Sequence, residues 1–134
     1  MRIKLGAVLA LVLVSCAVGP NIDTFEPARR ATGTEGTVSV NAGGTAFSRV
    51  GELIAVRDTD FLLLTADGLE RIPHEAVRSA EFSDARPRSI RRAGTESQRR
   101  DLARYSRYSF GLDGEQLSAL LSALGQSELI EVGR

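Results

Sequence analysis

Few side chains in this sequence could carry out nucleophilic, acid–base or metal chemistry. Its 134 residues include one cysteine, Cys16, and one histidine, His74, which lies in the segment PHEA at 73–76. A zinc site normally needs several Cys or His ligands. No G-x-S-x-G elbow is present that could pair a nucleophilic serine with His74 and Glu75. We therefore expect no catalytic residue, no metal site and no cofactor, and we interpret His74 as a solvated turn residue.

Two aspartates and a glycine pair offer weaker signals. Asp58 and Asp60 are one residue apart, so their carboxylates could chelate a hard cation. Acidic residues are equally typical of tight turns, and strand-like stretches on both sides favour a turn here. The glycines of NAGGT at 41–45 do not form a phosphate-binding P-loop, because no lysine follows them and no helix is predicted there.

Arginine is concentrated in one part of the chain. Residues 17–85 carry 6 arginines and 11 acidic residues, whereas residues 86–107 carry 8 arginines and 2 acidic residues. Guanidinium groups match the geometry of phosphates and carboxylates. These arginines could pair with acidic residues of the same domain, or they could bind an external anion. The candidate anion-binding residues are Arg86, Arg88, Arg91, Arg92, Arg99 and Arg100.

The first residues have the composition of a secretory signal. Arg2 and Lys4 precede an uninterrupted apolar run at residues 5–14. That run is about half of the roughly 20 residues that a helix needs to cross a bilayer. A short apolar segment behind a basic start is typical of a signal peptide, which we place at residues 1–15.

The residues LVSC at 13–16 resemble the lipobox of bacterial lipoproteins. The resemblance implies cleavage between Ser15 and Cys16, a diacylglycerol on the Cys16 thiol, and an N-acyl chain such as palmitate on the new amino group. In that family a non-acidic residue after the cysteine, here Ala17, implies the outer membrane. Two or more acyl chains anchor a protein stably. We therefore expect a lipid-anchored protein of the cell envelope, facing the periplasm.

Three regions are predicted after the signal peptide. Residues 16–36, with two prolines and three glycines, are expected to be a lipidated N-terminus and flexible tether. Residues 37–84 are expected to form a small β-barrel. Residues 85–134 are expected to comprise an arginine-rich linker and a helical part that packs on the sheet.

The region from 37 to 82 has the alternation and turn signals of short antiparallel strands. Strands are predicted at 37–40, 45–58, 61–66, 69–72 and 76–82, with hairpin turns at NAGG and at the DG of 67–68. Gly51, inside the long second strand, indicates a bend or bulge. The pattern predicts a small meander β-barrel or a bent antiparallel sheet of four or five strands.

Residues 51–82 resemble the small SH3-like barrels of the Sm-like and PRC-barrel type. The likeness lies in the acidic turn at 58–60, the apolar strand and DG hairpin after it, and the Ile72–Pro73 step with a helical turn before the last strand. The resemblance implies a fold and no particular activity. The RNA-pocket motifs of Sm-type proteins are absent, so we expect no nucleic-acid partner.

Two helices are predicted after the sheet, which makes the fold class α+β. TESQ at 95–98 and Asp113 with Gln116 are capping-box arrangements. Gly125 is expected to end the second helix. An apolar side on that helix is expected to cover an open face or end of the barrel, and a further edge strand is possible at 128–132. This side consists of Leu117, Leu120, Leu121 and Leu124.

These observations favour a non-enzymatic protein. We expect a membrane-anchored interaction or scaffold module of the envelope that docks an unidentified protein partner. The alternative is an anion-binding module, in which the arginine-rich region holds lipid headgroups or cell-wall polyanions.

Overall fold

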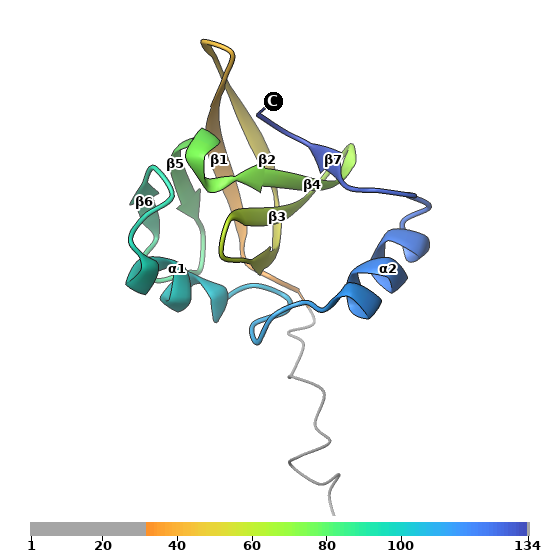
Figure 1. Ribbon diagram of the computed structural model, residues 1–134. Coiled ribbons are helices and arrows are strands. Elements are labelled where there is room, and N and C mark those ends of the chain that lie inside the picture. The colour runs from red at the N-terminus through yellow and green to blue at the C-terminus, as the bar shows by residue number, and fades with distance from the viewer. Residues whose placement is uncertain (1–31, 134) are drawn as a thin grey trace, which may run out of the picture.

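The computed structural model describes residues 32–133, so Ser15, Cys16, the predicted signal peptide and most of the predicted tether lie outside the described residues. The described chain is an α+β fold in which a bent sheet is followed by two helices (Figure 1). The strands are β1 (Glu35–Ala42), β2 (Thr45–Val56), β3 (Asp60–Thr65), β4 (Gly68–Pro73), β5 (Val77–Phe82), β6 (Ser89–Arg91) and β7 (Ile130–Glu131). The helices are the single 3-10 turn η2 (His74–Ala76), α1 (Glu96–Ala103) and α2 (Gly114–Ala123).

The strands form one sheet in the order β6-β5-β1-β2-β3-β4-β7. Strands β1 to β4 are a meander of antiparallel hairpins, and β5 returns to pair with β1 on its other side. The edge strands β6 and β7 do not pair with each other within the described chain, so the bent sheet is not closed into a barrel. The predicted bent sheet is therefore confirmed. It has seven strands, because the further edge strand suggested at 128–132 forms as β7 and one strand that was not predicted, β6, is added.

Two hydrophobic cores lie on opposite faces of this sheet. Phe61 and Leu63 of β3 belong to the larger core, together with Leu102 of α1. Leu62, between them, belongs to the smaller core. Alternate residues of a strand point to opposite faces, and here both faces are covered. This explains why β3 reads as a continuous apolar run.

Strand β2 also contributes to both cores, and a β-bulge places two consecutive residues, Ile54 and Ala55, in the smaller one. Leu53 pairs with Leu63 and Ala55 pairs with Leu62, so Ile54 is the extra residue. The sequence indicated a bend or a bulge at Gly51, and the bulge lies at Ile54 instead. Position 51 is occupied by glycine because a Cβ there would overlap the carbonyl of Leu64 on β3.

The two helices begin where the sequence predicts. Thr95 and Gln98 form a reciprocal capping box at the start of α1, and Asp113 and Gln116 do the same for α2. At the end of α2, Gly125 has a φ of 70°. Helix α2 covers the smaller core only partly, since none of its residues is fully buried. No helix among the described residues is long and apolar enough to cross a membrane.

The hairpin turns agree with the sequence at one site and differ at another. Gly43 and Gly44, both with positive φ, form the turn between β1 and β2. In the β3–β4 hairpin the turn residues are Ala66 and Asp67. The turn is one residue earlier than predicted, because Gly68 already pairs with Thr65. Gln126 fixes this hairpin, since its Oε1 accepts a hydrogen bond of 2.7 Å from the Leu69 backbone N–H.

The first described residues are held against β2 and the segment after α1. The Gly33 N–H donates to Glu52 Oε1 at 2.6 Å, and Arg107 donates two hydrogen bonds to the same carboxylate at 2.8 and 2.5 Å. A Cβ at Gly33 would overlap the Leu53 carbonyl. The described domain thus includes residues before β1 that were predicted to belong to the tether.

Candidate anion-binding surface

The structure divides the six candidate arginines by whether they have partners inside the domain. On α1, Arg100 forms an exposed ion pair with Glu96 at 2.9 Å, and Arg99 donates to the Gly94 carbonyl at 2.7 Å. The other four are exposed, and no ion pair or side-chain hydrogen bond joins them to another described residue. These unpartnered arginines are Arg86, Arg88, Arg91 and Arg92.

The unpartnered arginines do not lie in one continuous band. Arg86 lines one hollow together with Asp101, and Arg88 lines another with Glu35 and Glu81. Arg91 and Arg92 instead lie together at the β5–β6 edge of the sheet, where they line a third hollow. Only this last hollow has arginines and no carboxylate among its lining residues.

That hollow also contains residues that the sequence did not single out. Arg78 of β5, together with Ser39 and Ser79, lines it with the two arginines of the predicted set. We call these five residues, Ser39, Arg78, Ser79, Arg91 and Arg92, the arginine groove. The sequence contains one signal for Arg78. Strict alternation of the strand at 76–82 would place this arginine on the inward face with Ala80 and Phe82, which is unfavourable for a charged side chain.

Arg99 and Arg100 line a different and larger cleft with Arg57. This cleft, of about 560 Å³, also includes Asp58, Glu96 and the ring of Phe110, which is 76% exposed. Its charge is mixed, because two acidic residues face three arginines there. We therefore regard it as a weaker candidate for anion binding than the arginine groove.

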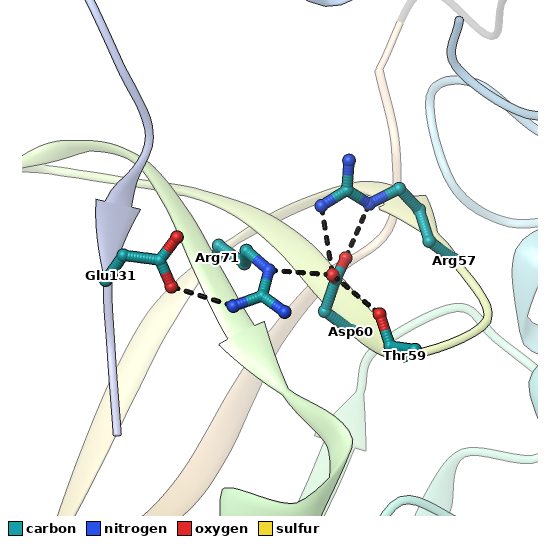
Figure 2. Close-up of polar contacts among 5 residues, drawn as sticks. All are labelled: Arg57, Thr59, Asp60, Arg71 and Glu131. Carbon is teal, nitrogen blue, oxygen red and sulfur yellow. Dashed lines mark hydrogen bonds and ion pairs between the residues drawn. The ribbon is translucent and has the colours of Figure 1, made fainter. Parts of the chain in front are cut away.

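Asp58 lies in the turn between β2 and β3, as predicted, whereas Asp60 is the first residue of β3 and pairs with Pro73 of β4. Asp58 is exposed, whereas Asp60 is buried, with 2% of its surface accessible. Figure 2 shows the Asp60 carboxylate between two guanidinium groups. Arg57 Nε donates to Oδ1 at 2.6 Å, and Arg71 Nε donates to Oδ2 at 2.9 Å. Arg71 also donates to Glu131 on β7 at 2.8 Å, so one ion network joins the β2–β3 turn, β3, β4 and β7.

The partners of Asp60 control its ionisation. Burial alone would raise the pKa of this carboxyl group, but the hydrogen bonds and charge of Arg57 and the hydrogen bond from Arg71 outweigh burial. Its pKa is therefore lowered. Both carboxylate oxygens of Asp60 accept hydrogen bonds from side chains of the protein. We therefore interpret Asp60 as a structural residue and not as a cation ligand.

A second buried carboxylate lies near the β1–β2 hairpin. Glu70 of β4 is fully buried, and burial raises its pKa despite Arg49 and the Thr65 hydroxyl. Arg49 Nε lies 3.3 Å from Glu70 Oε2, which is an ion-pair distance, but the geometry is not that of a hydrogen bond. Glu70 is therefore an internally paired acid at this end of the sheet.

His74 is in the predicted turn but is not solvated as predicted. It forms part of η2, its ring centroid lies 4.6 Å from that of Phe61, and its Nε2 is buried with no hydrogen-bond partner among the described residues. Burial, and then the charge of Arg99, lower the pKa of His74. The ring therefore packs as a neutral group, and Glu75 beside it is exposed.

Neither a metal centre nor a known relative points to another site. Among residues 32–133, no group of three or more His, Cys, Asp and Glu side chains is placed to hold a metal ion. No family model matches the chain, and no curated protein or solved structure is significantly similar to it.

The Asp60 network predicts a specific dependence of stability on pH. Replacing Asp60→Asn should lower the free energy of unfolding at pH 7 by about 3 kcal/mol, because two guanidinium groups lose their buried counter-charge. The pKa of Asp60 is lower in the folded than in the unfolded chain, so its contribution is present above about pH 3.8 and is lost as the pH falls through the folded value. Urea unfolding from pH 7 down to pH 3 measures both effects.

The exposed neighbour provides the matched control for this prediction. Asp58→Asn removes the same charge two residues before Asp60 and should change the unfolding free energy by less than about 0.5 kcal/mol. Equal losses in the two variants would contradict a role for Asp60 as the centre of the network.

Proposed function

We propose that this chain is a lipid-anchored protein of the cell envelope whose folded domain is a non-enzymatic binding module. Anchoring is supported by the signal-like residues 1–15 and by the likeness of LVSC to a lipobox. A cleaved and acylated Cys16 would hold the domain beside the outer membrane on the periplasmic side. The segment between Cys16 and Gly33 is the only covalent connection between the proposed anchor and the described domain.

The domain itself is proposed to be a small sheet scaffold of the SH3-like kind. Support comes from η2, which follows the Ile72–Pro73 step directly and leads into β5, as the resemblance implied. Such scaffolds carry unrelated functions, so the fold alone does not identify a partner.

One observation favours anion binding over general protein docking. The arginines in the described domain divide into those with internal partners, such as Arg57, Arg71 and Arg107, and a set that is exposed and unpartnered. Exposed guanidinium groups without internal counter-charges remain available to external phosphates and carboxylates. We therefore assign anion binding as the activity of the module, with docking of an envelope protein as the second candidate.

The anchoring part of the proposal is tested at Cys16. Cys16→Ser removes the thiol that would receive the diacylglycerol, so the chain should appear in the soluble envelope fraction or accumulate as an uncleaved precursor. Fractionation of cells and mass measurement of the product provide the readout. A variant that is cleaved normally and remains in the membrane fraction would refute the anchor, and Ser48→Ala in the domain is the control that should behave as wild type.

The anion-binding part is tested with a soluble polyanion. The full chain in a neutral detergent should bind heparin, and the salt concentration needed for elution should fall in the double variant Arg91→Gln, Arg92→Gln. Charge-based binding of this kind also weakens as ionic strength rises, because salt screens exposed charges.

The control variant removes the same charge from partnered positions. Arg99→Gln with Arg100→Gln should lower the elution salt less, since both side chains already have partners on or near α1. If wild type fails to bind, or if both double variants elute alike, anion binding through the unpartnered arginines is wrong and docking of a protein becomes the preferred function.

A further inference from the structure

The arginine groove combines charge, donors and shape at one place on the sheet. It is a hollow of about 470 Å³ lined by Ser39 of β1, by Arg78 and Ser79 of β5, and by Arg91 and Arg92 at the end of β6. Three guanidinium groups and two hydroxyl groups therefore line one hollow, and none of the lining residues is acidic.

Strand register explains why these side chains share one face. Ser39 pairs directly with Ser79, and Ser79 pairs with Arg91, so the three form one row across β1, β5 and β6. Directly opposed residues of antiparallel strands project from the same face. The row places Ser79 next to Arg91 and Ser39 one strand further away.

A β-bulge adds Arg78 to the row. Ser39 pairs with Ser79, whereas the next residue, Val40, pairs with Val77, so Arg78 is the extra residue of β5. Strict alternation would turn Arg78 towards the core with Ala80 and Phe82. Because the bulge interrupts alternation, Arg78 is exposed beside Ser79.

Arg92 is held by an unusual backbone conformation. Its φ is 53°, and it is the only non-glycine residue in the described chain with a positive φ. Its N–H donates to the Arg78 carbonyl at 2.6 Å, which ties the ends of the two arginine-bearing strands together. Strained conformations of this kind persist where the surrounding structure enforces them, and they are frequent at binding sites.

The grouping has an electrostatic cost that a bound anion would remove. Three like charges line the groove without an internal counter-charge, and like charges repel at short range. The forked donors of three guanidinium groups, together with two hydroxyl groups, exceed what the two oxygens of a carboxylate can accept. A terminal phosphate group, bonded to carbon through a single ester oxygen, offers three free oxygens and up to two negative charges.

We propose that the arginine groove is a binding site for a single phosphate group, carried either by a lipid headgroup or by a soluble phosphate compound. This inference rests on the proposed function, since it names the ligand class of the anion-binding module. The proposed site includes Arg78, Ser39 and Ser79 in addition to the predicted residues Arg91 and Arg92. Arg86 and Arg88 are not part of it.

The test uses inorganic phosphate as the probe and the full chain in a neutral detergent. Backbone amide NMR signals of Ser79 and Arg92 should shift and saturate during titration with phosphate at constant ionic strength, and sodium chloride at the same ionic strength should not reproduce the shift.

Arg78→Gln with Arg91→Gln should weaken phosphate binding at least tenfold. The matched control, Arg86→Gln with Arg88→Gln, removes the same charge from exposed, unpartnered positions outside the groove and should change it less than twofold. If the Arg78 substitution perturbs the β-bulge, the single variant Arg91→Gln on the short edge strand β6 replaces the double variant, and it should also weaken phosphate binding.

The source of the phosphate is distinguished by a second arm. In nanodiscs of phosphatidylcholine with added phosphatidic acid, whose headgroup is a terminal phosphate, the same amides should shift to the same end point if the group belongs to a lipid. A shift with inorganic phosphate but not in these nanodiscs assigns the site to a soluble compound.

Two results would overturn the inference, and they separate it from the proposed function. If the groove amides do not saturate with phosphate, or if both double variants weaken binding equally, the groove is not a phosphate site. Should heparin binding persist in that case, only the groove assignment fails. If the wild-type chain does not bind heparin either, the anion-binding function itself is refuted.

Discussion

The buried carboxylate of Asp60 is the interaction on which one end of the sheet depends. Removing a carboxylate from water costs several kcal/mol unless charges and hydrogen bonds replace the lost hydration. Here Arg57 at the end of β2 and Arg71 on β4 supply both, and Arg71 extends the connection to Glu131 on β7 (Figure 2). One set of charges therefore holds together the β2–β3 turn, the β3–β4 hairpin and strand β7.

The same requirement determines which arginines remain available to other molecules. The buried acids Asp60 and Glu70 and the largely buried Glu52 are paired with Arg57, Arg71, Arg49 and Arg107. The β5–β6 edge has no buried acid, and its exposed arginines have no internal partner. Stability is thus associated with one part of the sheet and the proposed binding surface with another. Loss of binding without loss of stability is therefore expected for changes at β5 and β6.

Local sequence signals predicted most of the secondary structure. Both capping boxes, the glycine turn at 43–44 and the strand alternation identified elements that the structure contains. Features that depend on distant contacts were missed. The strand β6 exists because Ile90 packs in the larger core opposite Ala80, which no local pattern in an arginine-rich segment indicates. The burial of Asp60 and of His74 depends in the same way on Arg71 and Phe61. The arginine groove was only half predicted, because the bulge that exposes Arg78 arises from pairing with β1.

The β5–β6 face is the proposed binding surface of this protein. The most direct measurement is photo-cross-linking in intact cells, with a photoreactive residue at the exposed Ser89 on β6, two residues from Arg91, and, for comparison, at the exposed Ser118 on α2. Mass spectrometry of the products identifies what is attached. We predict adducts with a phosphate-bearing compound from position 89 and only background from position 118. A dominant protein adduct from position 118, with none from position 89, would contradict a binding role for the β5–β6 face.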